Sequence, residues 1–191
     1  MKTKLCLLIL LIVGLSVQLS ANPINGLLER IDKGASKKFV IEFKKGADDF
    51  FELDQKGTKV VVRGNNYVNI ATGINWYLKY YAGIQLSWNG MQAKLPQVLP
   101  PVPRKERHET SLSLRYDFNY CTYSYTMAFW DWERWEKEID WMALHGINLP
   151  LAAVGQECIW FNMLQKLGYS KDEINRFIAG PAFLAWWAMN N

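Results

Sequence analysis

The stretch Trp132-Glu-Arg-Trp-Glu-Lys-Glu-Ile-Asp-Trp-Met-Ala-Leu-His-Gly-Ile-Asn-Leu-Pro-Leu-Ala-Ala-Val154 carries a helix pattern followed directly by a strand pattern. Asp131 can cap the helix at its start, and Gly146 stands at the C-terminal cap position. The apolar run 147–154 predicts a strand buried on both faces, with a bulge near Pro150. Apolar residues spaced three or four apart predict the buried face of the helix, formed by Trp132, Trp135, Ile139 and Met142.

The same alternation of elements continues on both sides of this stretch. Residues 112–116 predict a strand before the helix, and a second helix is expected to end at Gly168. Ser170 and Glu173 form a capping box for a third helix, and the tail 183–191 also has a helical pattern. Strands that alternate with helices through short links indicate βα units and a parallel sheet.

The preceding residues have a different pattern, that of a small α/β unit. Apolar residues at helical spacing predict a helix over 67–81, and the prolines and charges of 96–107 predict a stiff linker. We therefore expect a small N-terminal α/β domain over 22–107 and a second domain over 108–191. Alternating apolar residues predict strands at 38–43, 49–54, 59–63 and 84–88, the second and third joined as a hairpin.

The first 21 residues have the composition of a secretory signal peptide. A positive start precedes an apolar segment over 5–17, which is too short to span a bilayer comfortably, and small residues suit cleavage before Asn22. No cysteine stands just after the apolar segment, so we expect no lipoprotein anchor and no stable membrane anchor. The expected location is periplasmic or secreted, or lysosomal if the source is a eukaryote.

The bulk composition of the 191 residues is globular, with 50% hydrophobic and 21% charged residues. The net charge is +4, but no basic stripe with stacking aromatics appears, which argues against nucleic-acid binding. Two cysteines remain after the leader, Cys121 and Cys158; we favour two unpaired buried thiols over one disulfide. Their spacing does not suggest metal binding, so we expect no metal site.

Two positions could carry chemistry, because parallel βα units gather binding groups after the carboxyl ends of their strands. One is 117–125, after the first predicted strand, and the other is 155–157, after the second. Asn119 and Gln156 could exchange hydrogen bonds with sugar hydroxyls. Glu157 could act as an acid, a base or a hydroxyl anchor, or could simply be a first-turn carboxylate that the helix dipole favours.

The surrounding segment is unusually aromatic, since seven of the nine tryptophans lie between Trp130 and Trp187. Rings beside polar groups can stack on a sugar, but they can equally form an aromatic core, and composition leaves both interpretations open. Glycoside hydrolysis requires two carboxylates at a set separation, and no convincing pair can be named within the 191 residues.

Several motifs in this region closely resemble the α-N-acetylglucosaminidase family, glycoside hydrolase family 89. The resemblance runs from about Arg115 to the end, and 25–88 is similar to the small N-terminal α/β domain of that family through 73–80 and 87–88. The motifs that carry it are Asn119-Tyr-Cys-Thr-Tyr-Ser-Tyr125 and the stretches 130–144, 146–149, 155–157 and 180–186.

The resemblance implies that 108–191 contains the first βα units of a (β/α)8-type barrel. It implies exo-acting, retaining removal of terminal α-linked N-acetylglucosamine from glycans, without a cofactor, by two glutamates that lie beyond residue 191. This fragment alone is therefore expected to be inactive. In the family pattern, Pro150 and Cys158 stand where small residues are expected. The matching site residues are Asn119 and Cys121, which correspond to the family's sugar pocket, and Gln156 and Glu157, which correspond to its motif after the second strand.

A different class of function stays open beside this one. An exported, non-catalytic carbohydrate-binding or scaffold module would keep the aromatic surface and lack the catalytic acids. The two interpretations differ in whether an in-frame continuation with both glutamates follows residue 191.

Overall fold

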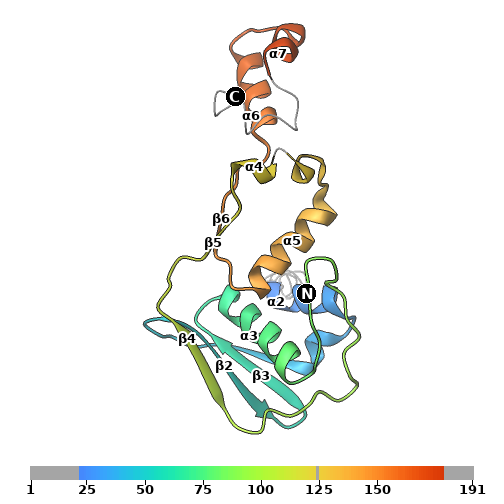
Figure 1. Cartoon of the computed structure of the whole chain (residues 1–191), viewed down its shortest axis with the longest axis vertical. Helices are drawn as coiled ribbons and strands as arrows, with labels where there is room; N and C mark the ends of the chain where they lie inside the picture. Colours follow the sequence, from blue (N-terminus) through green and yellow to red (C-terminus); the bar gives the residue numbers. More distant parts are fainter. Residues whose placement is uncertain (1–21, 124, 179–191) are drawn as a thin grey trace, which may run out of the picture.

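The computed structural model of the chain describes residues 22–123 and 125–178. The molecule is elongated, with the part up to residue 110 at one end and the helices after residue 155 at the other (Figure 1). The segment between them joins the two ends. The predicted signal peptide over 1–21 and the helical pattern over 183–191 lie outside the described residues.

The small domain contains a four-stranded sheet in the order β1-β3-β2-β4. β1 pairs parallel with β3, whereas β2 pairs antiparallel with both β3 and β4. The predicted hairpin between the second and third strands is confirmed, with Lys56 opposite Lys59 next to the turn. The strands are β1 (Phe39–Phe43), β2 (Asp49–Lys56), β3 (Lys59–Gly64) and β4 (Glu106–Thr110).

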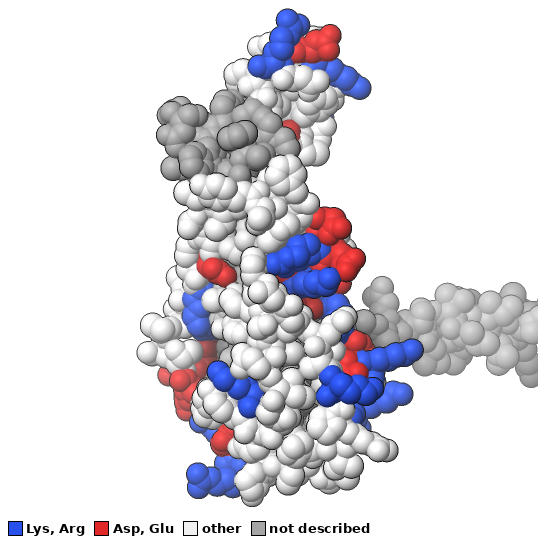
Figure 2. Space-filling view, turned by 45° about the vertical axis from the view of Figure 1, so that its right-hand side comes forward, with Lys and Arg blue, Asp and Glu red and all other residues white. Residues whose placement is uncertain are grey.

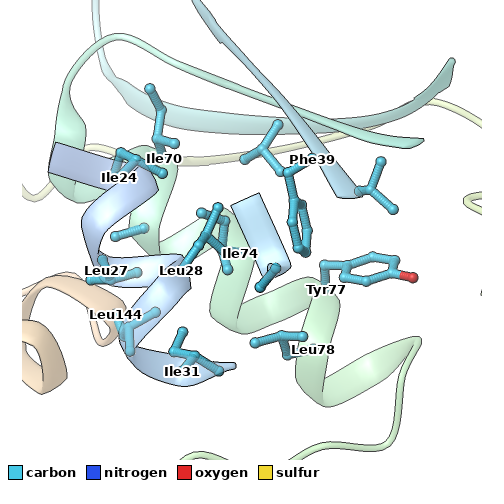
Figure 3. Close-up of a cluster of buried hydrophobic side chains, with 14 of the residues drawn as sticks. Ile24, Leu27, Leu28, Ile31, Phe39, Ile70, Ile74, Tyr77, Leu78 and Leu144 are labelled. Carbon is cyan, nitrogen blue, oxygen red and sulfur yellow. The ribbon is translucent and has the colours of Figure 1, made fainter. Parts of the chain in front are cut away.

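Helices α2 (Pro23–Ile31) and α3 (Tyr67–Tyr80) pack together against one face of this sheet (Figure 3). The α3 prediction is confirmed, whereas α2 was not predicted; its start is capped by Asn22, which accepts a bond from the Ile24 amide at 3.0 Å. Gly73 brings α3 close to the sheet, because a Cβ there would lie 2.9 Å from the Val62 side chain. A short 3-10 helix, η1 (Ala35–Lys38), leads from α2 into β1.

Two segments of the small domain differ from the sequence-based predictions. Residues 84–88 are not a strand but hold one isolated bridge, Ser87 to Gly90. The proline-rich segment is not a free linker either, because the Tyr77 hydroxyl donates to the Pro100 carbonyl at 2.6 Å and two side chains of the segment, Leu99 and Val102, are core residues. Leu95, just before the segment, is buried as well.

The charged run at the end of that segment begins strand β4. Its side chains alternate between half-buried and exposed, as on an edge strand, and charge on an edge resists pairing with another chain. Partners across the sheet explain the pairing: Glu52 of β2 is 1% exposed and lies opposite Arg107. Its carboxylate forms ion pairs with Lys44 at 2.7 Å, Lys105 at 3.0 Å and Arg107 at 3.1 Å.

The predicted parallel βα unit is present in the second part of the chain, with shorter strands than expected. β5 (Tyr116–Asp117) pairs parallel with β6 (Leu149–Pro150). The prediction that 147–154 is buried on both faces was wrong, because Leu149 and Pro150 are both exposed. Pro150 has no amide hydrogen to donate, and the sheet has two strands within the described residues.

Helix α5 (Trp132–Leu144) connects β5 to β6 and packs against α3. Its predicted ends are confirmed: the Asp131 side chain accepts from the Arg134 amide at 2.9 Å, and Gly146 has a φ of +80°. Its predicted buried face was partly wrong, because Trp132 is 69% exposed and Ile139 is 46% exposed. The residues that are buried instead are Glu138, Asp140 and Leu144, together with the predicted Met142.

Polar pairs explain this change of face. Arg30 of α2 donates two hydrogen bonds to Asp140, at 2.6 and 2.7 Å, and lies 3.6 Å from Glu136. The Leu144 side chain joins the core of the small domain and lies next to Leu27 and Ile31 of α2 (Figure 3). Acidic and basic side chains gather side by side over the middle of the molecule in Figure 2.

The remaining helices form the far end of the molecule. Gly168, with a φ of +96°, follows α6, and the Ser170–Glu173 capping box at the start of α7 is confirmed. α6 contains no fully buried residue. Among the described residues, no helix is both long and apolar enough to cross a membrane. These elements are α4 (Tyr120–Tyr123), η2 (Thr126–Phe129), α6 (Gln156–Lys166) and α7 (Lys171–Phe177).

Glu52 gives the small domain a defined response to acid. Burial raises the pKa of Glu52, but the three cations around it have a larger, opposite effect. The net result is a pKa lowered from 4.5 to about 2. The folded pKa lies below the unfolded one, so the stabilisation is complete above pH 4.5 and is lost as the pH falls to about 2. At about 1.4 kcal/mol per pKa unit, Glu52 then accounts for about 3 kcal/mol of unfolding free energy.

Urea unfolding between pH 5 and pH 2 measures this contribution. We expect Glu52→Gln to flatten the fall in unfolding free energy with pH by most of that amount. Glu133→Gln, an exposed carboxylate paired with Lys137, is the matched control and should keep the wild-type slope. A Glu52→Gln slope equal to that of the wild type would contradict the assignment.

Asp140→Ala should lower the free energy of unfolding by about 1–3 kcal/mol, because it leaves Arg30 without its two-pronged acceptor at the α2–α5 contact. Glu133→Ala removes an exposed pair on the same helix and should cost no more than about 0.5 kcal/mol. Chemical denaturation of both variants checks the difference, and equal losses would refute the proposed role of Asp140.

Candidate functional site

The carboxyl ends of β5 and β6 lie side by side and define a candidate binding site. Tyr116 is opposite Leu149 and Asp117 is opposite Pro150, and the Leu151 amide donates to the Asp117 carbonyl at 3.0 Å. The segments that follow the two strands therefore leave the sheet at the same edge. We call this region the strand-end site, residues 117–123 and 151–158.

The chain turns out of β5 at Phe118, whose backbone conformation is rare for residues other than glycine. Its φ is +73°, and it is the one residue other than glycine with a positive φ in the described parts of the chain. Such strain costs on the order of 1–3 kcal/mol and persists where the surroundings enforce it. Here the ring packs edge-on against Tyr123 at 5.8 Å and Trp135 at 6.4 Å. Nothing in the sequence pattern indicated this turn, because phenylalanine is not a residue that favours it.

Asn119 follows this turn and is exposed at the strand-end site. Its side-chain oxygen accepts from the amides of Cys121 at 2.9 Å and Thr122 at 3.2 Å, so it caps the short helix α4. No described residue bonds to its side-chain nitrogen. A ligand at this edge would therefore meet an N–H donor whose direction is fixed by the cap.

The two cysteines lie on the two sides of the strand-end site. Cys121 is on α4 and Cys158 is in the first turn of α6, and both are free and exposed. The prediction that they are unpaired holds in the structure, but the prediction that they are buried was wrong. Each lies in the first turn of a helix that follows a strand end, and few described residues pack against it there. The Asn162 amide donates to the Cys158 sulfur at 3.5 Å.

Gln156 and Glu157 are the first two residues of α6 and are half-buried. Gly155, at a φ of +79°, turns the chain into the helix without providing a side-chain cap. The first-turn amides of α6 and the carboxylate of Glu157 thus lie at the N-terminal end of the helix, where the helix dipole is positive. The structure places Asn119 and Cys121 after one strand and Gln156 and Glu157 after its parallel neighbour. Their roles stay predictions.

Four aromatic rings at this end, those of Phe118, Tyr123, Trp130 and Trp135, form a second small core. Tyr123 and Met127 are buried in it, and the Tyr123 hydroxyl donates to the Leu151 carbonyl. Burial raises the pKa of Tyr123 above its usual value, which fits a hydroxyl that stays a donor. For these rings the core interpretation is the one that applies. The rings that stay exposed around the site are Tyr116, Tyr120, Tyr125, Phe129 and Trp132.

An arginine between two tryptophans ties this aromatic core to the small domain. The Arg134 guanidinium lies 3.9 Å from the Trp130 ring centre and 4.9 Å from that of Trp88. Buried Glu138 completes the cluster, because it pairs with Arg134 at 2.9 Å and accepts from the Trp88 indole at 2.5 Å. The motif Ser87-Trp88 was noted in the sequence, but its partners on α5 were not predicted.

In the described part of the chain, no group of three or more His, Cys, Asp or Glu side chains is arranged to hold a metal ion. The chemistry that the strand-end site offers is polar recognition: an amide donor, helix-start amides, a carboxylate and exposed rings around them.

Comparison with known proteins places both parts of the chain. Residues 22–101 match the N-terminal domain of the α-N-acetylglucosaminidase (NAGLU) family, and residues 115–191 match its TIM-barrel domain. Human α-N-acetylglucosaminidase is 44% identical over 160 residues, which is 84% of this chain and 22% of that protein.

Solved structures of a family 89 glycoside hydrolase from Clostridium perfringens also match this chain. They superpose with a TM-score of 0.82 at 40% identity, over 89% of this chain and 20% of theirs. One contains 2-acetamido-1,2-dideoxynojirmycin, and another contains the substrate of that enzyme, GlcNAc-α-1,4-galactose. This chain thus spans about a fifth of the length of these relatives. The two domain matches in sequence order and the structural likeness show that the chain belongs to the α-N-acetylglucosaminidase family, glycoside hydrolase family 89, as a small α/β domain followed by the first βα units of the barrel.

Proposed function

We propose that this chain forms part of an exo-acting, retaining α-N-acetylglucosaminidase that removes terminal α-linked N-acetylglucosamine from glycans. The observation that carries the proposal is the likeness, at 40% identity and a TM-score of 0.82, to a family 89 hydrolase solved with GlcNAc-α-1,4-galactose. The chain matches the N-terminal domain of the family over 22–101 and its TIM-barrel domain over 115–191. The substrate of the relative gives the chemical class: a terminal sugar with an α-linkage and an acetamido group.

The strand-end site is the wall that this chain would contribute to the sugar pocket. In the proposal, the side-chain nitrogen of Asn119 donates to a sugar oxygen, and Cys121 borders the same face from α4. Gln156 and Glu157 bind hydroxyls from the start of α6. The anchored position of Asn119 supports this assignment, because a donor whose oxygen is already used in a cap loses little freedom on binding.

Hydrolysis with retention needs a nucleophile and an acid/base, carried by two carboxyl groups about 5–5.5 Å apart. We propose that both are glutamates outside residues 1–191. The relative bound to its substrate is a variant with two glutamates replaced by glutamine, which fits a pair of acids whose removal leaves the substrate intact. Glu157 is then a binding group and not one of the two.

The domain and export assignments are part of the same proposal. Residues 1–21 would direct export to the periplasm, the exterior or, in a eukaryote, the lysosome. Residues 22–107 would form the small domain, whose sheet continues through Thr110 in β4, and 108–191 would begin the barrel. The proposed partner is a glycan with a terminal α-linked N-acetylglucosamine.

The 191-residue chain alone should not hydrolyse a nitrophenyl α-N-acetylglucosaminide above a no-enzyme blank, because it lacks the pair of acids. Release of nitrophenol is measured at high protein concentration, with a full-length family member as the positive control. Turnover that Glu157→Gln abolishes would make Glu157 catalytic and overturn the proposal. Binding of the free sugar by the chain without turnover, paired with an inactive full-length protein, would favour the binding-module alternative.

In a full-length enzyme that carries this segment, Asn119→Ala should raise the barrier for kcat/KM by about 1–3 kcal/mol, the cost of one unmade polar sugar contact. Asn119→Asp separates two roles, because aspartate also caps helices but has no N–H to donate. We expect both variants to lose activity and the aspartate variant to keep wild-type thermal stability. Wild-type kcat/KM in Asn119→Asp would return Asn119 to a purely structural role.

A further inference from the structure

Arg115, directly before β5, joins more parts of the structure than the other arginines with described contacts. Its Nη2 pairs with Asp49 of β2 at 2.8 Å and donates to the Asn69 side chain of α3 at 3.2 Å. Its Nε donates to the Gly146 carbonyl, just after α5, and its Nη1 donates to the Leu112 carbonyl at 2.6 Å. One mostly buried guanidinium thus links the sheet, α3 and the end of α5.

The backbone of the same residue sets the start of β6. The Arg115 amide donates to the Asn148 side chain at 2.8 Å, and the Arg115 carbonyl accepts from the amides of Asn148 and Leu149, both at 3.2 Å. The Asn148 side chain also donates to the Ser113 carbonyl at 2.9 Å. The register between β5 and β6 is therefore fixed immediately before the two strands begin.

The surroundings of Arg115 leave little room for adjustment. Gly146 approaches so closely that a Cβ would lie 3.3 Å from the Thr72 hydroxyl and 3.7 Å from the Arg115 Nε. Burial alone would raise the pKa of Asp49, but hydrogen bonds from Arg115 and asparagine side chains hold it below the usual value, so the pair stays charged. Lysine could not replace this arrangement, because it has one nitrogen instead of a planar fork of three.

We propose that Arg115 is a positioning residue for the sugar pocket: by bonding to Asp49, Asn69 and the Gly146 carbonyl, it fixes β5 against β6 and so sets Asn119 relative to Gln156 and Glu157. The inference rests on the proposed function and adds a role for the small domain, which would act as the base against which the pocket wall is aligned. Arg115 lies close to Asn119 along the chain: it precedes Asn119 by four residues, and β5 (Tyr116–Asp117) lies between them.

Kinetics of a full-length enzyme that carries this segment test the proposal. Arg115→Lys should lower kcat/KM by roughly 10- to 100-fold, the loss expected when a contact group is displaced by about an ångström, with KM raised as well as kcat lowered. Asp49→Asn keeps an acceptor and should give a smaller loss in the same direction, which serves if Arg115→Lys folds poorly. Unchanged kcat/KM in folded Arg115→Lys or Asp49→Asn protein would overturn the proposal.

Arg63→Lys is the matched control. Arg63 also joins two carboxylates, Glu42 at 2.5 Å and Asp54 at 2.9 Å, but within the small-domain sheet and away from β5. It should lower the melting temperature and leave kcat/KM within about twofold, since it touches no part of the site. A comparable loss of kcat/KM in Arg63→Lys would mean that damage to the small domain is enough, and would overturn the specific role of Arg115.

A double-mutant cycle asks whether Arg115 acts through Asn119. In the Asn119→Ala background, Arg115→Lys should lower kcat/KM by a smaller factor than it does in the wild type, because one of the groups that it positions is already absent. Full additivity of the two losses would overturn the proposed route.

Hydrogen exchange provides a readout that needs no activity. In Arg115→Lys, the amides of 147–154 should exchange at least about tenfold faster, while those of the β2–β3 hairpin stay protected. Unchanged exchange in 147–154 overturns the positioning role by itself. A wild-type full-length protein that releases no N-acetylglucosamine refutes the proposed function instead, and leaves the exchange result to decide about Arg115.

Discussion

The burial of two carboxylates on α5 is the constraint on which the rest of the structure depends. Asp140 and Glu138 lie against the small domain, and each needs a cation and hydrogen bonds to remain there, supplied by Arg30 and Arg134. A purely apolar contact such as Leu144 could slide, whereas paired charges work in one geometry, so they set the direction of the helix. The small domain and the first βα unit are held together by this polar contact.

The direction of α5 in turn decides where the strand-end site can form. At the C-terminal end of the helix, the Gly146 carbonyl accepts a hydrogen bond from Arg115, and this bond aligns β6 with β5. At the N-terminal end, Trp130 and Trp135 support Phe118, whose strained turn places Asn119 at the sheet edge. Contacts on both sides therefore offset the entropic cost of ordering these two very short strands. The strand ends then have a defined position.

The parts of this arrangement that could be predicted from sequence have local causes. The β2–β3 hairpin, helix α3 and the caps at Asp131, Gly146 and Ser170 follow from turn chemistry and spacing within a few residues. The errors have distant causes: the partner of Asp140 is Arg30, 110 residues earlier, and the charged run in β4 pairs because Glu52 needs cations. Helical periodicity assigned Trp132 and Ile139 to the core, but could not include partners from another part of the chain.

The candidate site divides in the same way. Parallel βα order was enough to place Asn119 and Glu157 at one edge, because strand ends align whatever the side chains are. Composition could not separate the rings that form a core from those left at the surface, since both kinds occur within 116–135. The separation depends on Phe118, whose left-handed turn sends its ring inward beneath Tyr123 and its successor, Asn119, outward. The sugar pocket proposed at this edge would thus rest on this aromatic packing.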